Sequence, residues 1–377
     1  MKKYISFRPY FSGLVNIIMS YEMFLAIAAI TGRKVVLPPD CWMLFLSKSQ
    51  NKEDWTDFWQ IFDKEVLLKE FDCIEHNDVP EFQGNLDKMQ GMFSYTENIG
   101  KCGLSVSEIN FSSHVICGDH SVLVNNRVDT EDFNNFCNGR PVIELDCDKQ
   151  FIHFENNLFG HYWYHVYPGD ENCRNELKDK INKVLKYHGK FYHYADVVRK
   201  KLGQFNSIHV RRNDFLQTRK NDIECVNAPD KILEMVNKLP FNDKSLPLYI
   251  STDEKDRSFF SLLGENYDIH FYEDFDYQFG EDYVDDDLHT AVLEQVICSQ
   301  SENFFGTYLS TFSKRINIMR GLEGRQADDH FGINLPRENS NQSLTVSFPW
   351  SSMPDGRWHW NSSSYFQWTT EAPKVSQ

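Results

Sequence analysis

The stretch that decides the fold is SIHVRRNDF, residues 207–215. Its first four residues, 207–210, form a short run with β-branched side chains, which is typical of a buried strand. Arg211, Arg212 and Asp214 follow directly, where a strand would end and a loop begin. Ligands of open α/β sheets collect at the carboxyl ends of the strands, and a guanidinium fork fits phosphate oxygens. The stretch therefore indicates a phosphate site, with a salt-bridged strand end as the alternative.

A second strand end of this kind lies in residues 304–316, FFGTYLSTFSKRI. The expected strand stops at Gly306, and the hydroxyl residues Ser310 and Thr311 stand where a helix begins. The first N–H groups of a helix have no internal partners and carry the positive end of its dipole, so they attract anions. N-capping by a hydroxyl would explain the same residues. Two such strand ends in one expected sheet favour a diphosphate.

Strand and helix patterns alternate along the second half of the chain. After a helical stretch at 175–202, strands are predicted at 207–210, 248–251, 268–271 and 303–306, and helices at 230–239, 256–263, 291–299 and 312–322. This rhythm predicts a parallel, doubly wound sheet. The chain also opens with a strand–helix–strand unit, at 4–7, 14–31 and 34–37. An α/β fold with nucleotide-binding character is therefore expected.

Composition limits the classes of partner. The chain of 377 residues is 41% hydrophobic and 25% charged, which is typical of a globular protein long enough for two domains. Its formal net charge of −16 argues against affinity for nucleic acid or for an anionic membrane. The most apolar segment, 14–32, is interrupted by Asn16, Ser20 and Glu22, so we expect a buried helix and no membrane segment in this chain.

The spacing of the cysteines indicates the redox state of the cellular compartment. Nine cysteines occur without CxxC spacing, which favours scattered thiols in a reducing, cytoplasmic setting. No signal-peptide pattern follows the first residues. Three Asn-x-Ser tripeptides, at Asn110, Asn341 and Asn361, keep the lumen of the secretory pathway open as an alternative, if a signal or anchor was removed.

Taken together, the motifs resemble the fucosyltransferase superfamily, which includes the protein O-fucosyltransferases and the α1,2- and α1,6-fucosyltransferases. The segment HVRRND at 209–214 resembles the His-x-Arg-x-x-Asp element of that superfamily. Five further segments match in the same order: GLVN at 13–16, GRKVVLPP at 32–39, STDE at 251–254, EQ at 294–295 and STFS at 310–313. Each segment is weak by itself, and their common order makes the resemblance fairly specific.

The resemblance implies a GT-B architecture, in which two Rossmann-like domains face each other across a cleft. An N-terminal domain at 1–174 would then serve the acceptor, and a C-terminal domain at 175–330 would bind the GDP-sugar. Residues 331–377 are expected to form a tail that packs back on the body. The activity implied is an inverting transfer of fucose from GDP-fucose to a hydroxyl of a protein or glycan, with neither cofactor nor metal.

The resemblance also implies roles for particular residues. Arg211 would contact the diphosphate and stabilise the departing GDP, and Asn16 would lie close to the reacting centre, so these two are the expected catalytic residues. Asp253 would meet the guanine or the ribose. The expected donor-binding residues are His209, Arg212, Asp214, Asp253, Ser310, Thr311, Phe312 and Gly13. Asp40 and Asp214 are both candidates for the general base, which stays unassigned, and a dissociative reaction would need little help from a base.

Several alternatives remain open at this point. The segment STFSKRI at 310–316 favours the protein O-fucosyltransferases, whereas the Arg211–Arg212 pair is more typical of the α1,2- and α1,6-enzymes that act on glycans. A glycan-binding module on the same fold would need no diphosphate contacts. Asp146-Cys147-Asp148 has the DxD form of metal-dependent glycosyltransferases, but the other motifs do not fit that class. A GDP-sugar other than fucose would satisfy the same residues.

Overall fold

The computed structural model of the chain describes residues 2–8, 13–38, 57–82, 112–116, 121–124, 131, 134, 139, 141–145, 148–154, 164–167, 171–218, 228–238, 244–280, 283–307, 310–323 and 325. The chain forms two compact units, which divide between Tyr187 and His188. The expected tail at 331–377, Asp40 and the three Asn-x-Ser tripeptides lie outside the described residues.

The first unit contains two parallel sheets. Its larger sheet has the order β3-β2-β1-β7-β4 and consists of β1 (Tyr4–Phe7), β2 (Lys34–Leu37), β3 (Cys73–Glu75), β4 (Ser113–Ile116) and β7 (Phe151–Phe154). The smaller sheet has the order β6-β5-β8, with β5 (Ser121–Val124), β6 (Val142–Glu144) and β8 (Tyr164–Tyr167). All described strand pairs of the two sheets are parallel, so the expected α/β organisation is confirmed for this half.

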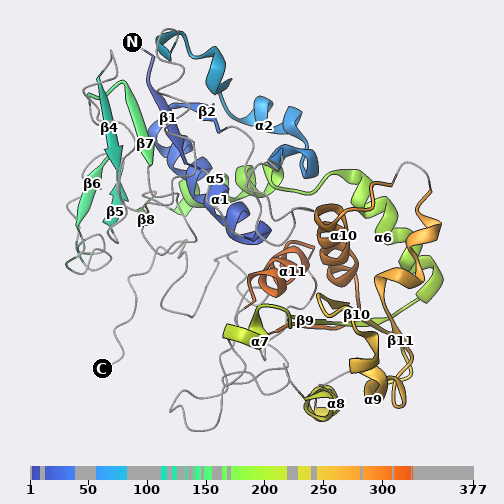
Figure 1. Cartoon of the computed structure of the whole chain (residues 1–377). Coiled ribbons are helices and arrows are strands. Elements are labelled where there is room, and N and C mark those ends of the chain that lie inside the picture. The colour runs from blue at the N-terminus through green and yellow to red at the C-terminus, as the bar shows by residue number, and fades with distance from the viewer. Residues whose placement is uncertain are drawn as a thin grey trace. The chain divides into compact units, whose positions relative to one another are not determined.

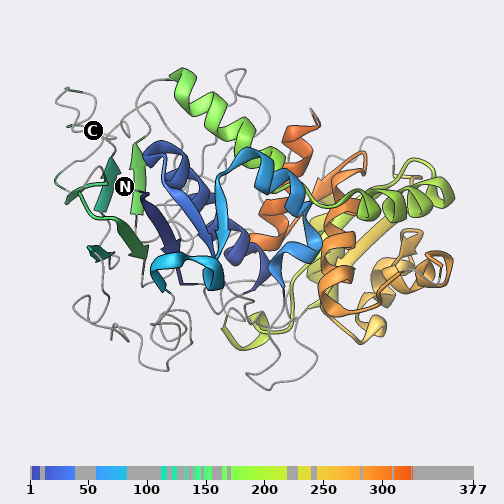
Figure 2. The ribbon, with the colours of Figure 1, turned by 90° about the horizontal axis from the view of Figure 1, so that it is seen from above.

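Helix α1 (Leu14–Thr31) is the core helix of the first unit and lies against β1 and β2 (Figures 1 and 2). By length and composition it is the one helix in the described part of the chain that could span a membrane, but 72% of it is buried inside the protein. Its end at Gly32 adopts a left-handed backbone, with φ of 59°, that glycine tolerates best. The helix is therefore a buried core helix, as the sequence predicts.

Short helices complete the described part of this unit. They are η1 (Phe58–Ile61), α2 (Lys64–Glu70), η2 (His76–Asp78), η3 (Pro80–Phe82) and α5 (Glu171–Val184). The stacking of Tyr21 on Phe58, with ring centroids 3.9 Å apart, joins α1 to η1. Aromatic contacts thus connect the core helix to the short helices of this unit.

The helical stretch expected at 175–202 is present and is divided into two helices, α5 and α6 (Gly189–Leu202). Tyr187 forms an isolated antiparallel bridge with Phe62, which requires extended backbone at that point. The next residue, His188, is the N-cap of α6, and its Nδ1 accepts a hydrogen bond from the backbone N–H of Lys190 at 3.2 Å. A long-range backbone contact and a new cap therefore override the local helical propensity.

The second unit is built on a four-stranded parallel sheet. Its strand order is β11-β10-β9-β12, with β9 (Asn206–Val210), β10 (Leu248–Thr252), β11 (Ile269–His270) and β12 (Phe304–Phe305). The chain moves from β9 outward to β10 and β11, and then returns to the other side of β9 with β12. The strand order thus reverses between β9 and β12, which is the kind of point where α/β sheets bind ligands.

Helices cover both faces of this sheet. Figure 1 shows α8 (Pro229–Lys238) and α9 (Ser261–Gly264) on one face, and α6, α10 (Asp287–Ser299) and α11 (Thr311–Leu322) on the other. The remaining described helices of this unit are α7 (Phe215–Thr218), η7 (Arg257–Phe260), η8 (Tyr272–Asp274) and η9 (Asp276–Gln278). The doubly wound arrangement expected from the alternating pattern is confirmed.

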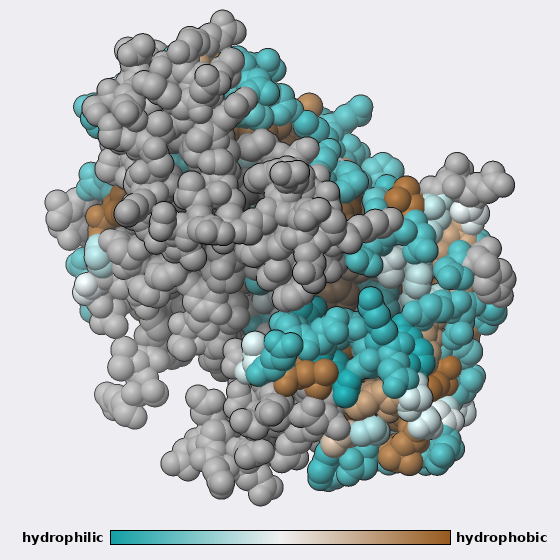
Figure 3. Space-filling view, viewed as in Figure 1, coloured by the Kyte–Doolittle hydropathy of each residue, from teal (hydrophilic) through white to brown (hydrophobic). Residues whose placement is uncertain are grey.

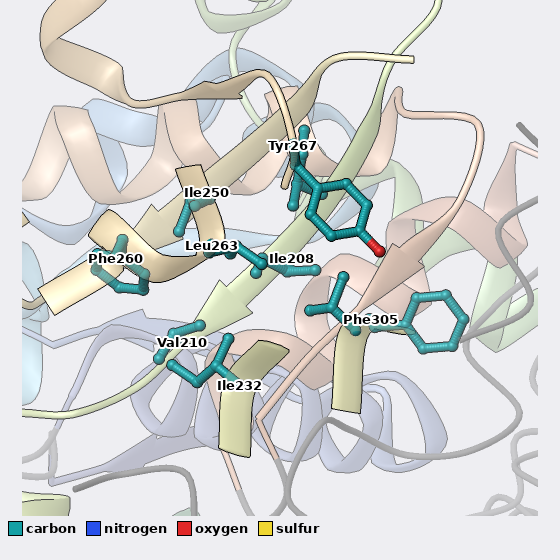
Figure 4. Close-up of a cluster of buried hydrophobic side chains, with 10 residues drawn as sticks. Ile208, Val210, Ile232, Ile250, Phe260, Leu263, Tyr267 and Phe305 are labelled. Atoms are coloured by element: carbon teal, nitrogen blue, oxygen red, sulfur yellow. The ribbon is translucent and has the colours of Figure 1, made fainter. Parts of the chain in front are cut away.

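The two faces of β9 carry different kinds of side chain. Ile208 and Val210 point into a hydrophobic cluster with Ile250 of β10, Ile232 of α8 and Leu263 of α9 (Figure 4). Each fully buried aliphatic side chain of this kind contributes about 1.5–3 kcal/mol to the free energy of unfolding. Side chains alternate along a strand, so Ser207 and His209 face the opposite side, toward α10 and α11. The apolar face holds the sheet together, while the other face carries polar residues.

The described surface is mostly hydrophilic on the face shown in Figure 3, with small separate apolar areas. The large apolar side chains that are exposed lie far apart in the sequence: Leu68, Val142, Val284 and Leu322.

Candidate functional site

Three strand ends meet at one edge of the second unit's sheet. The parallel register pairs Val210 with Thr252, and Ile208 with Phe305. The residues that follow these strands are Arg211, Asp253 and Gly306, and they therefore emerge side by side. This edge lies where the strand order reverses, so the two stretches singled out by the sequence are brought together.

Arg211 is held by two carboxylates. Its Nε donates to Oδ1 of Asp214 at 2.9 Å and lies 3.3 Å from Oδ2 of Asp253. All three side chains are partly buried, and ion pairs of this kind fix the plane of a guanidinium. The alternative of a salt-bridged strand end is therefore present in the structure, and it also orients the arginine at the sheet edge.

Asp253 fixes the loop that carries Arg211. Its Oδ1 accepts hydrogen bonds from the backbone N–H groups of Arg212, at 2.6 Å, and Asn213, at 3.3 Å. Burial raises the pKa of the Asp253 carboxyl, while the charge of Arg211 and the two backbone donors lower it. This carboxylate joins the ends of β9 and β10.

Arg212 is engaged within the same unit. Its guanidinium forms an ion pair with Glu254 and lies over the ring of Phe259, with 3.9 Å between Cζ and the ring centroid. These contacts tie the Arg212 side chain to the residues that follow β10. Its expected contact with the donor stays a prediction.

His209 lies behind this edge, on the polar face of β9. The side chain is 3% exposed and stacks on Phe312 of α11, with ring centroids 4.5 Å apart. Burial, and to a smaller extent the charge of Arg211, lower the pKa of His209 to about 3. The imidazole is therefore neutral at physiological pH.

Helix α11 begins immediately above the end of β12. Ser310 occupies the N-cap position of α11 but makes no capping hydrogen bond with its side chain. A Cβ at Gly306 would lie 2.3 Å from Cβ of Ser313, so the strand end and the helix approach more closely than any other residue would allow. The start of α11, where a helix has N–H groups without intrahelical partners, therefore lies at the same edge as Arg211.

Two expected site residues lie in the first unit. Gly13 is the N-cap of α1, and its carbonyl accepts hydrogen bonds from the N–H groups of Asn16, at 3.0 Å, and Ile17, at 3.2 Å. Asn16 lies in the first turn of α1 and is partly buried. Two members of the DxD segment, Asp146 and Cys147, lie outside the described residues. Among the residues with described positions, no group of three or more His, Cys, Asp or Glu side chains is placed to hold a metal ion.

Two buried residues near the site were not predicted to have a function: Thr307 and Glu294. Thr307 bridges β9 and β12, since its Oγ1 accepts a hydrogen bond from the N–H of Arg211 and donates one to the carbonyl of His209, both at 2.8 Å. The hydroxyl that follows Gly306 was the available signal. Glu294 lies buried on α10, and burial raises its pKa to about 8. No local pattern distinguishes such a residue from an exposed helical glutamate.

The fold and the strand-end residues define an α/β protein of the nucleotide-binding type. The chain belongs to the GDP-fucose protein O-fucosyltransferase family, whose model matches residues 4–323. The resemblance found in the motifs is thereby confirmed.

Individual relatives are distant. GDP-fucose protein O-fucosyltransferase 2 of Caenorhabditis elegans is 29% identical over 126 residues, which is 32% of this chain and 27% of that protein. The proteins of the same name from Plasmodium vivax and Plasmodium berghei are 29% identical over 164 residues and 26% identical over 193 residues, with 41% and 48% of this chain covered. The chain spans 27–38% of the length of these relatives.

Solved structures of fucosyltransferases are similar at still lower identity. POFUT1 in complex with GDP-fucose is 13% identical, with a TM-score of 0.45 over 85% of this chain and 94% of that one. NodZ α-1,6-fucosyltransferase soaked with GDP-fucose is 11% identical, with a TM-score of 0.44 over 84% of this chain and 92% of that one.

Proposed function

We propose that this protein transfers fucose from GDP-fucose to a hydroxyl group of a protein, with inversion at the anomeric carbon and without a metal ion. The observation that carries the proposal is the convergence of Arg211, Asp253 and the start of α11 at one edge of a parallel sheet. Family membership supplies the donor, because the relatives named above are GDP-fucose protein O-fucosyltransferases.

The proposed chemistry uses positive charge that the protein itself supplies. The bond between the fucose C1 and the β-phosphate oxygen breaks, and its electron pair stays on the phosphate. Arg211 and the N–H groups at the start of α11 stabilise the negative charge that develops there. The acceptor oxygen bonds to C1 from the opposite face, which inverts the configuration. Its proton passes to a base, for which Asp214 and Asp40 remain the candidates.

The other expected residues take supporting roles in this proposal. Ser310, Thr311 and Phe312 enclose the phosphates, and Asp253 meets the ribose or the guanine. His209 and Asp214 shape the loop after β9 or touch the nucleotide. Gly13 and Asn16 belong to the domain that serves the acceptor, expected at 1–174, and the donor domain is expected at 175–330. A GT-B architecture, as the resemblance implies, is part of this proposal. The proposed setting is the cytoplasm, as expected from the sequence, with the lumen of the secretory pathway as the alternative.

Thermal unfolding with nucleotides tests the donor class. The protein is melted with GDP, GDP-fucose, GDP-mannose, UDP or ADP, each with and without EDTA, and Arg211→Ala serves as the control. A ligand at about 100 times its dissociation constant should add about 2.7 kcal/mol to the free energy of unfolding. We expect stabilisation by guanine nucleotides that EDTA does not change. Stabilisation by UDP that EDTA abolishes would instead support the DxD alternative.

Transfer of labelled fucose then tests the acceptor. A folded protein domain and a free glycan are offered with GDP-fucose, and the product is analysed for anomeric configuration. Transfer to the protein supports the proposal. Transfer only to the glycan would favour an α1,2- or α1,6-type enzyme, and glycan binding without GDP binding would favour a non-catalytic module.

A further inference from the structure

Three polar residues next to Arg211 form a connected hydrogen-bond network, called the bracket below. The bracket consists of His209 at the end of β9, Thr307 after β12 and Ser313 in the first turn of α11. The Ser313 Oγ lies 2.7 Å from Nδ1 of His209 and accepts the backbone N–H of Thr307 at 2.9 Å. Thr307 in turn bonds the backbone of His209 and of Arg211. The bracket therefore ties the histidine ring to the loop that carries the arginine.

The partners of Ser313 determine where its proton lies. A hydroxyl has one proton to donate and can accept two hydrogen bonds. The backbone N–H of Thr307 can only donate, so it cannot receive the hydroxyl proton. Among the described residues, the remaining partner of the hydroxyl is Nδ1 of His209. If Nδ1 carried the proton and donated to the Ser313 oxygen, the buried hydroxyl proton would have no acceptor among the described residues. The Ser313 O–H therefore donates to an unprotonated Nδ1.

The tautomer of His209 follows from this. A neutral imidazole carries its single proton on one of its two nitrogens. Because Nδ1 accepts from Ser313, the proton lies on Nε2. A doubly protonated ring would lose this acceptor and would place a positive charge beside Arg211 in a buried position. Burial and the charge of Arg211 both lower the pKa of His209, so the neutral form persists.

The stack on Phe312 fixes the direction of the ring. The two ring planes lie at 27° to each other, and Phe312 belongs to the helix start expected to enclose the phosphates. Within the part of the chain that the structure describes, Nε2 has no hydrogen-bond partner of its own. A neutral N–H donor is thus held beside Phe312 at the start of α11.

We propose that Ser313 is a positioning residue that locks His209 in the Nε2–H tautomer, so that Nε2–H donates to an oxygen of a nucleotide diphosphate. This inference rests on the proposed function for the identity of the ligand, but the tautomer itself is independent of any ligand. Thr307 supports the lock, because its N–H occupies the Ser313 oxygen and leaves the hydroxyl proton for Nδ1.

Nitrogen NMR of the histidine rings tests the lock without a nucleotide. The full chain is labelled with ¹⁵N-histidine, and the His209 signals are assigned by their loss in His209→Gln. We expect a protonated Nε2 and an unprotonated Nδ1 in the wild-type protein. Ser313→Ala should shift His209 toward a mixture of tautomers, while Ser299→Ala, which removes another buried helical hydroxyl that bonds the carbonyl of Val296, should not. A protonated Nδ1 in the wild type would overturn the inference even if the variants fail to fold.

A double-mutant cycle tests the ligand contact. Ser313→Ala should weaken GDP binding by the fraction of His209 that leaves the Nε2–H tautomer, which is about twofold for an equal mixture. In the His209→Gln background the same change should leave GDP binding unchanged, because a glutamine amide is a neutral donor without tautomers. Equal effects in both backgrounds would show that Ser313 acts only on packing, and would overturn the inference. If wild-type protein binds no GDP, the ligand contact fails together with the proposed function, whereas the NMR result stands by itself.

Discussion

Arg211 and Asp253 follow neighbouring strands of the second unit's sheet, and Nε of the arginine lies 3.3 Å from Oδ2 of the aspartate. The same carboxylate also accepts backbone N–H groups from the loop after β9. A single side chain from β10 therefore sets both the backbone and the guanidinium of the adjacent strand end. This relationship makes the effects of several substitutions predictable.

Replacement of Arg211 tests its place at the reacting phosphate. We expect Arg211→Ala to lower the rate of fucose transfer by about two to three orders of magnitude, as is typical when one preorganised donor is lost. Steady-state kinetics with varied GDP-fucose would measure the effect. Arg199→Ala, on the exposed side of α6, is the matched control and should leave the rate unchanged. An acceptor-binding module would keep its affinity in the Arg211 variant and show no turnover in either protein.

Replacement of Arg212 distinguishes its role from that of the neighbouring Arg211. Its guanidinium pairs with Glu254 and lies over Phe259, so we expect Arg212→Ala to lower the free energy of unfolding by about 1–3 kcal/mol. The loss of GDP affinity should be smaller than for Arg211→Ala, as measured by calorimetry. Equal losses for the two variants would instead support the direct donor contact expected from the sequence.

Glycine at position 306 is required by the approach of α11 to β12. A methyl group there would meet the Ser313 side chain at 2.3 Å, and such overpacking costs about 1–3 kcal/mol. Gly306→Ala should therefore unfold at a lower denaturant concentration and bind GDP more weakly, because the start of α11 must move. Gly189→Ala is the control, since a Cβ at that helix start meets nothing within 4 Å. A Gly306→Ala protein with wild-type stability would contradict the described packing.

Glu294 should make stability depend on pH. Burial raises the pKa of its carboxyl from 4.5 to about 8 in the folded chain. A raised folded-state pKa means that the protonated group stabilises the fold, and that this contribution is lost as pH rises from about 4.5 to about 8. We expect Glu294→Gln to melt a few degrees above the wild type at about pH 8.5, with the difference shrinking toward about pH 5.

The control for this prediction is Glu265→Gln, an exposed position in the turn after α9. Its melting temperature should follow that of the wild type at every pH. A Glu294→Gln profile parallel to the wild type would show that Glu294 does not titrate in this range.

The candidate site could be found in part from the sequence because its main residues follow recognisable strands. The β-branched residues of β9 are followed by Arg211, and the phenylalanine pair of β12 is followed by Gly306, so both strand ends are visible as changes of residue type. The hydroxyls of Thr307 and Ser313 are visible in the sequence, but their partners are not, because a hydroxyl near a helix start has many ordinary uses. The break between α5 and α6 was also invisible, since it depends on a bridge between Tyr187 and Phe62, which are distant in the sequence.

The sequence by itself determined the alternating strands and helices of the second unit, because helical and strand periodicity and strand-ending residues are local properties of the chain. It determined the parallel α/β class and the kinship with fucosyltransferases, since ordered short motifs carry both. The tertiary structure alone decided that β12 returns beside β9, and thus that Thr307 bonds Arg211 and that Ser313 meets His209. Such pairings depend on strand order and helix packing, which bring together groups that no local pattern connects.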